Sequence, residues 1–178
     1  MSPFEVIAGE QIASGCEREI IRASRSSGVP VGILYAVGLT ESGRGGRLQP
    51  FAMNDDGKSA FFNRRHEAVS HFRSVKANGA RFVDIGCMQI NYRFHSVHFA
   101  NVEDMFDPRK NVEYAAKFLR DLRNREGSWV MAAARYHAGP RNHAAHHRYV
   151  CAVLQRLVET GFGAWTAEAR QLCAHAPT

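Results

Sequence analysis

A long amphipathic segment in the C-terminal half of the chain constrains the fold more than any other feature. Residues 107–127, DPRKNVEYAAKFLRDLRNREG, carry apolar side chains at helical spacing between charged ones. The apolar positions are Val112, Ala115, Ala116, Leu119 and Leu122. Asp107 and Pro108 form a typical helix start, and Gly127 a typical helix end. Because a helix with one apolar stripe gains most of its stability by packing that stripe, the segment predicts a largely helical core.

Further helices and a few short strands account for most of the remaining chain. Helical spacing or helix start and end signals mark residues 16–27, 31–42, 65–79, 128–140 and 148–161. The Asp-Gly turn within 51–62 predicts a β-hairpin, and the β-branched run at 82–86 predicts a third strand. A chain of 178 residues suits one domain. We therefore predict a mainly helical α+β fold with a small antiparallel sheet, spanning 16–178 after an N-terminal extension at 1–15.

One carboxylate, that of Glu41, lies at the end of the apolar predicted helix VGILYAVGLTES. Leu34, Val37 and Gly38 precede it by seven, four and three residues, so they share its helix face. If that face packs inward, the carboxyl loses solvation, which favours its protonated form near neutral pH. A protonated carboxyl in an apolar cleft is what a general acid needs. The alternative is a solvated residue at a frayed helix end.

The charge of the chain limits the classes of partner that it can bind but does not identify one of them. The formal net charge is +6 and the pI is about 9.5, which favours nucleic acid, anionic lipid or an acidic wall polymer. No DNA-binding motif or basic tail is present, so we do not expect a nucleic-acid partner. No apolar run is long enough to span a membrane, and the first residues lack the pattern of a signal peptide.

The cysteines bear on redox compartment and on metal binding. They are Cys16, Cys87, Cys151 and Cys173. None forms a Cys-x-x-Cys pair, which argues against a zinc ribbon. A disulfide between Cys16 and Cys173 would tie the two ends of the chain down and would imply an oxidising compartment. Four separate thiols in a reducing compartment are the alternative.

Three short motifs occur in order along the chain: GLTESG at 38–43, GCMQIN at 86–91 and AARYHAG at 133–139. Together they resemble the lytic transglycosylase family, whose pattern is a Glu-Ser pair, a Gly-x-Met-Gln-Ile segment and an Ala-x-Tyr-Asn-Ala-Gly segment. RYVCAVL at 148–154 also resembles the Tyr-Val helix that closes the family's domain. The similarity covers roughly 16–158. Each motif alone is weakly specific, whereas all of them in order are strongly specific.

The resemblance implies a lysozyme-like fold and cleavage of the β-1,4 bond between MurNAc and GlcNAc in peptidoglycan, with a 1,6-anhydro-muramic product. One glutamate serves as acid and base in this family, and Glu41 matches it. The positions that match residues shaping or contacting the sugar site are Ser42, Met88, Gln89 and Tyr136. Core packing is the alternative for Met88, and Tyr136 would hydrogen-bond either Glu41 or the N-acetyl group. His137 stands where the family has an asparagine. The polar contact that the asparagine makes is therefore either made by the imidazole of His137 or lost.

Asp84 introduces a second mechanism. The segment DIGCMQIN also resembles the segment of animal lysozymes that carries their second catalytic carboxylate. A retaining glycosidase needs two carboxyls about 5 Å apart, so a hydrolytic muramidase would use Asp84 together with Glu41. However, these two residues are 43 positions apart here, far more than in those lysozymes. We therefore expect Asp84 to line the substrate site rather than to act as a nucleophile.

Partners and location follow from the resemblance alone. The long segment between the first two motifs is most similar to specialised members that open the wall for a flagellum or a secretion apparatus. This implies flagellar rod or secretion-system partners beside the glycan strand, and a wall-binding docking module is a third alternative. Because the substrate lies outside the inner membrane, we expect a periplasmic protein whose signal peptide is absent from this sequence. His143 and His147 have a metal-ligand spacing but no Cys or Glu partners nearby, so we expect neither metal nor cofactor.

Overall fold

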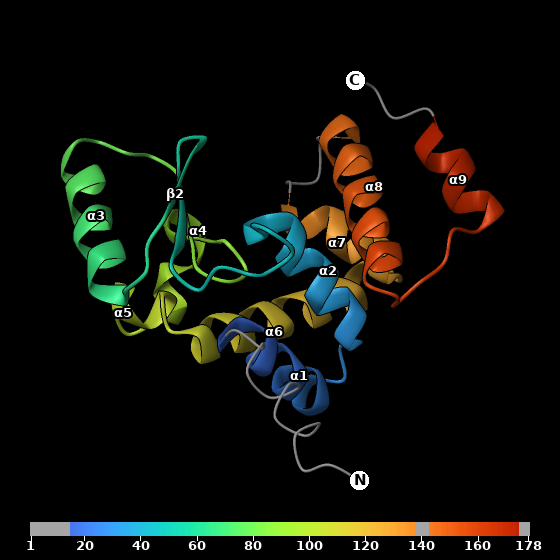
Figure 1. The fold of residues 1–178 in the computed structure, drawn as a ribbon, viewed down its shortest axis with the longest axis horizontal. Coiled ribbons are helices and arrows are strands. Elements are labelled where there is room, and N and C mark those ends of the chain that lie inside the picture. Colours follow the sequence, from blue (N-terminus) through green and yellow to red (C-terminus); the bar gives the residue numbers. More distant parts are fainter. Residues whose placement is uncertain (1–14, 138–142, 175–178) are drawn as a thin grey trace, which may run out of the picture.

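Most of the helices form one side of the molecule, and a small sheet accompanied by the helices labelled α3, α4 and α5 forms the other, as Figure 1 shows. The structure is a computed structural model and describes residues 15–137 and 143–174. The helices are α1 (Gly15–Ser27), α2 (Val31–Ser42), α3 (Arg65–Ala77), α4 (Tyr92–His95), α5 (Val102–Met105), α6 (Pro108–Glu126), α7 (Trp129–His137), α8 (His143–Glu159) and α9 (Ala167–Ala174), with the 3-10 helix η1 (Ser96–His98). The strands are β1 (Ala52–Asp55), β2 (Lys58–Phe61), β3 (Val83–Ile85) and β4 (Ile90–Asn91). On the helical side α1 packs on α6, α6 on α7, and α8 on both α2 and α7, whereas α3 lies against β1.

The sheet is antiparallel, with the strand order β2-β1-β3-β4. β1 and β2 are joined by Asp56 and Gly57, which both adopt positive φ angles, 44° and 93°. An Asp-Gly pair tolerates this backbone well, and the predicted hairpin is confirmed. The predicted third strand is also confirmed as β3. It places Asp84 opposite Asn54 on one side and Asn91 on the other.

Helix α2 runs through the core and is buried on most of its surface. Leu34 and Val37 are fully buried. A Cβ at Gly38 would lie 2.3 Å from Leu48 Cδ2 and 3.0 Å from the Met88 sulfur, so a larger residue there would force these buried side chains to shift. The missing side chain lets the last turns of α2 approach the segment between β3 and β4 closely.

Helix α6 buries the whole apolar stripe that its sequence predicts. The Asp107 side chain caps the helix by accepting a hydrogen bond from the backbone N–H of Lys110 at 3.0 Å. Gly127 ends it with a φ of 82°. The mainly helical α+β class and the small antiparallel sheet are therefore confirmed.

The sequence analysis did not predict several short elements or the first residues of one long helix. Helix α8 begins at residue 143 rather than 148, and α9 was not predicted because it is short and mostly exposed, so no apolar periodicity marks it. The pieces α4, η1, α5 and β4 have two to four residues each, too few to show a period. The predicted helix end at Gly139-Pro140 and nearly all of the N-terminal extension lie outside the described residues.

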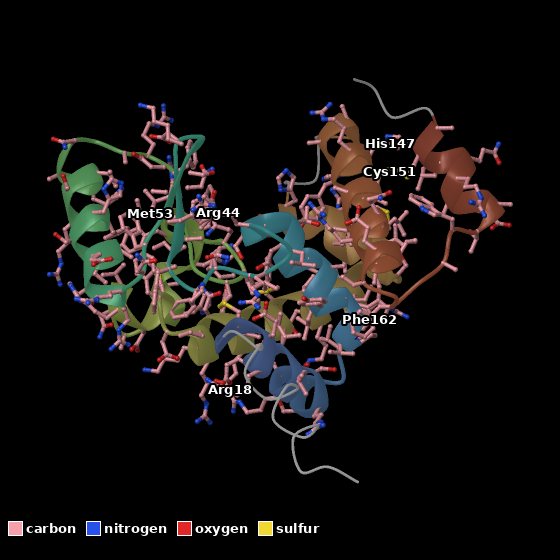
Figure 2. The ribbon with its side chains drawn as sticks, viewed as in Figure 1. Arg18, Arg44, Met53, His147, Cys151 and Phe162 are labelled. Atoms are coloured by element: carbon pink, nitrogen blue, oxygen red, sulfur yellow. A yellow bond between two sulfur atoms is a disulfide. The ribbon has the colours of Figure 1, made fainter. Side chains whose placement is uncertain are left out.

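Two disulfides form, and neither joins Cys16 to Cys173. Cys16 on α1 pairs with Cys87 between β3 and β4, and Cys151 on α8 pairs with Cys173 on α9. Figure 2 shows Cys151 and His147 on the side of α8 that faces α9, and His147 Nε2 lies 2.7 Å from the carbonyl oxygen of Leu172. The predicted pairing is wrong because α9 folds back on α8, away from α1 (Figure 1).

Removing each disulfide should therefore have a different effect. Cys16→Ser with Cys87→Ser should lower the free energy of unfolding by about 4 kcal/mol, because that bond spans 71 residues and both cysteines are fully buried. Cys151→Ser with Cys173→Ser should remove about 3 kcal/mol or less, since the bond spans 22 residues and holds only α9 to α8. Denaturant unfolding measures both. A larger loss from the second pair would contradict this assignment.

Candidate active site

A tight turn between β3 and β4 is held by one buried side-chain amide, that of Asn111 on α6. Asn111 is fully buried, and its Oδ1 accepts a hydrogen bond from the backbone N–H of Met88 at 2.9 Å. Its Nδ2 donates to the carbonyl oxygens of Ile85 at 2.9 Å and Met105 at 2.8 Å. Gly86 has a φ of 81°, and a Cβ there would lie 2.6 Å from Asn111 Nδ2. The turn can therefore pack on this amide only with glycine at that position.

Two hydroxyl groups hold the same turn from the helical side. Ser42 Oγ donates to the carbonyl oxygen of Cys87 at 2.7 Å, and the Tyr136 hydroxyl donates to that of Met88 at 2.8 Å. Ser42 is 3% exposed and Met88 is fully buried, so their side chains support the site from beneath and do not line its cavity. The sugar contacts expected of Ser42 and Met88 stay predictions, although both side chains are buried away from the cavity wall. The Tyr136 hydroxyl binds the turn and not Glu41, so its contact with the N-acetyl group is the alternative that stays a prediction.

Glu41 lies in the last turn of α2, and its side chain is only 15% exposed. The Tyr149 hydroxyl donates a hydrogen bond to Glu41 Oε1 at 2.6 Å. His137 Nδ1 lies 3.7 Å from the same oxygen, and the imidazole stacks on the Tyr149 ring with their centroids 4.3 Å apart. Interaction with the Glu41 carboxylate raises the pKa of His137 although burial opposes it. At 3.7 Å the contact is too long for a hydrogen bond, and it is an ion pair when the imidazole is protonated and the carboxyl ionised. The carboxyl is thus held in one place by α7 and α8.

A cavity of about 480 Å³ opens beside this carboxyl and is lined by residues of both the helical and the sheet side. The predicted site residues on its wall are Glu41, Asp84, Gln89, Tyr136 and His137. Gln89 adopts a φ of 46°, and its Nε2 donates to the carbonyl oxygens of Gly86 and Ala52 at 3.0 and 3.2 Å. The structure therefore brings together five of the seven residues that the sequence singled out.

Asp84 reaches the cavity from the middle of the sheet. Asn91 Nδ2 donates a hydrogen bond to Asp84 Oδ1 at 2.7 Å. Burial raises the pKa of Asp84 to about 6; the hydrogen bond from Asn91 opposes the rise, and the negative charge of Glu41 adds to it. The two carboxylates therefore interact electrostatically at one cavity, but the residues that surround each of them differ.

The structure adds residues that sequence reasoning did not assign to the site. Tyr149, which holds Glu41, entered only as part of a motif, because 108 residues separate the two and no local pattern links them. Burial, aided by the charge of Glu41, raises the pKa of Tyr149 well above its ordinary value, so its hydroxyl stays a donor. Phe82, Phe94 and Phe118 also line the cavity. The position of Tyr149 in the RYVCAVL match was the one available signal.

The sequence of the chain matches the model of a known protein family. The family model described as the transglycosylase SLT domain matches residues 18–156. The match covers most of the chain, and the chain belongs to this family. Its members are peptidoglycan lytic transglycosylases, lyase-type enzymes that cleave glycan, with a lysozyme-like α+β fold. The predicted family, fold and enzyme class are confirmed, and peptidoglycan is the substrate, which is consistent with an extracytoplasmic location.

The other comparisons add no relative. Searches of curated proteins and of solved structures found no match. Within 15–137 and 143–174, no helix is long and apolar enough to cross a membrane. The same residues hold no group of three or more His, Cys, Asp or Glu side chains that could bind a metal ion. The side chain of His143, half of the histidine pair noted in the sequence, lies outside what the structure describes.

Loss of the Tyr149 hydroxyl should impair the enzyme without unfolding it. Tyr149→Phe removes a hydrogen bond to a carboxylate, an interaction of about 1.5–3 kcal/mol, and should lower kcat/KM about 10- to 100-fold. Turbidity loss of purified cell walls measures the rate. Tyr35→Phe is a matched control, because Tyr35 lies on α2 but does not line the cavity. Full activity of Tyr149→Phe would contradict this role.

Titration of Asp84 should make the free energy of unfolding depend on pH. Its pKa is raised in the folded state, so folding favours the protonated form, and stability falls as pH rises from about 4 to about 6. Asp84→Asn removes this loss. The free energy of unfolding of Asp84→Asn, taken relative to that of the wild type, should therefore be about 2–3 kcal/mol larger at pH 7 than at pH 4. Urea unfolding of both proteins at the two pH values measures it. If the variant differs from the wild type by the same amount at pH 4 and at pH 7, the raised pKa of Asp84 is contradicted.

Proposed function

We propose that Glu41 is the general acid and general base of a peptidoglycan lytic transglycosylase that cleaves the β-1,4 bond between MurNAc and GlcNAc. The observation that carries this proposal is a single carboxyl at the end of a buried helix, 15% exposed, aimed at the cavity and held by Tyr149 and His137. A carboxyl fixed against two supporting groups can transfer a proton with little reorganisation.

The reaction needs one proton to leave Glu41 and another to return. In the first half, Glu41 protonates the glycosidic oxygen, the bond from this oxygen to the anomeric carbon breaks, and GlcNAc departs as the alcohol. In the second half, the 6-hydroxyl of the same muramic ring attacks the anomeric carbon and gives its proton to Glu41. The product is a 1,6-anhydro-muramic end, no water is consumed, and neither a metal nor a cofactor is required.

The surrounding residues take supporting roles in this proposal. Positive charge develops on the sugar ring as the bond breaks, and the ionised carboxylate of Asp84 would stabilise it across the cavity. Gln89 and Tyr136 form the sugar-facing wall. His137 pairs with Glu41 Oε1, so the imidazole takes over a polar contact at the position where the family has asparagine.

A hydrolytic muramidase is the second candidate, and one observation favours it. Glu41 and Asp84 line the same cavity, and the charge of one raises the pKa of the other. A retaining hydrolase would use Asp84 as the nucleophile and admit a water molecule in the second half of the reaction. Asp84 is less suited to this because Asn91 already occupies one of its oxygens.

The cellular setting belongs to the same proposal. The two disulfides support an oxidising compartment, which for a wall-cleaving enzyme is the periplasm. The segment between the first two motifs supports local opening of the wall for a flagellum or a secretion apparatus, with rod or channel proteins as partners. A docking module without activity would bind sacculi and release no soluble fragments from them.

Substitution of each carboxylate separates these functions. Glu41→Gln should fold normally and lose at least about 100-fold in wall-clearing rate, the range expected for a general acid–base. Asp84→Asn should lose about tenfold or less if Glu41 works alone, and as much as Glu41→Gln if the enzyme is a muramidase. Glu159→Gln, at an exposed site at the end of α8, is the control. A fully active Glu41→Gln would refute the proposal.

A further inference from the structure

Two arginines and two phenylalanines form an exposed group at the sheet end of the cavity. We call Arg81, Phe82, Arg93 and Phe94 the aromatic–arginine cluster. Phe82 and Phe94 line the cavity and are 38% and 62% exposed. The guanidinium carbon of Arg93 lies 5.3 Å from the ring centroid of Phe82 and 5.8 Å from that of Phe94, and that of Arg81 lies 5.6 Å from the Phe82 ring. The proton transfers at Glu41 make no use of this cluster.

The cluster has a fixed place because its backbone is tied to the sheet. The Asp56 carboxylate, in the β1–β2 turn, accepts hydrogen bonds from two consecutive N–H groups beginning with that of Arg81, both at 3.0 Å. Asn91 caps α4 by accepting a hydrogen bond from the N–H of Arg93 at 3.1 Å, while its amide donates to Asp84. The same asparagine thus connects the cluster to the carboxylate on the cavity wall.

The charges of the cluster are available to a ligand. Within the described part of the chain, neither Arg81 nor Arg93 forms an ion pair, whereas Arg22 and Arg73 each lie 2.6 Å from a glutamate. Asp56 acts on Arg81 through charge at longer range. A guanidinium stacked on an aromatic ring is pre-oriented, and its planar donors match a carboxylate. A carboxylate-bearing ligand is therefore the chemistry that this cluster suits.

We propose that the aromatic–arginine cluster binds the free carboxylates of peptidoglycan stem peptides while the glycan strand occupies the cavity. The proposal rests on the proposed function. Stem peptides are attached to the muramic rings and carry free carboxylates, so a strand placed at Glu41 brings such a group to the cavity rim. The cluster makes the enzyme selective for strands that still carry their peptides over bare glycan.

The test compares two forms of one substrate. Purified peptidoglycan is used with its stem peptides intact, or after an amidase has removed them. Arg81→Gln with Arg93→Gln should lower kcat/KM on the peptide-bearing strands about tenfold, as expected for the loss of two charge-assisted contacts, and leave bare glycan unaffected. The control is Arg120→Gln with Arg123→Gln, which removes two positive charges on α6 outside the cavity. Thermal unfolding confirms that both double variants are folded.

Each outcome decides the proposal. A loss confined to peptide-bearing strands and to the cluster variant supports it. An equal loss on both substrates, no loss on either, or the same loss in the control overturns it. Co-sedimentation with the two glycan forms separates this from the proposed function. A wild-type protein that cleaves neither form would refute the proposed function, but co-sedimentation would still test the role of the cluster. Tighter binding of peptide-bearing strands that depends on Arg81 and Arg93 supports that role. Equal binding of the two glycan forms overturns it.

Discussion

The buried amide of Asn111 is the interaction on which the rest of the site depends. Its three hydrogen bonds satisfy backbone groups at both ends of the β3–β4 turn and at the end of α5. A backbone group left unsatisfied in this position would destabilise the fold by about 1–3 kcal/mol. The same turn receives the hydroxyls of Ser42 and Tyr136 and the disulfide from α1. These contacts join the helical side to the sheet side at this turn, and the cavity opens beside it.

Two carboxylates reach this cavity from opposite sides with different surroundings. Glu41 comes from the buried helix α2 and is held by a hydroxyl on α8, whereas Asp84 comes from β3 and is held by an amide. Burial and the charge of Glu41 oppose ionisation of Asp84, which raises its pKa to about 6. Unequal environments are the usual means by which neighbouring carboxyls take different roles, and they favour one proton-transferring group here over two equivalent ones.

Local signals made most of the fold predictable from sequence. The α6 stripe, the Asp56–Gly57 turn and the Gly127 helix end each specify their own element within a few residues. Contacts between distant segments were not predictable. The bond from Tyr149 to Glu41 and the Cys16–Cys87 pair depend on how α8 and α1 pack, and no periodicity encodes that. Ser42 and Met88 matched sugar-site positions, yet only the structure could reveal that they are buried beneath the cavity.

The mass of the released fragments tests most directly whether Glu41 works alone. Purified peptidoglycan digested by the wild-type enzyme would be analysed by mass spectrometry beside the same material digested by a hydrolytic muramidase. If the 6-hydroxyl of the sugar closes the reaction, the fragments end in 1,6-anhydro-muramic acid and are one water lighter than the reference products. Fragments of the hydrolysed mass would contradict this mechanism and assign Asp84 the role of the second catalytic carboxylate.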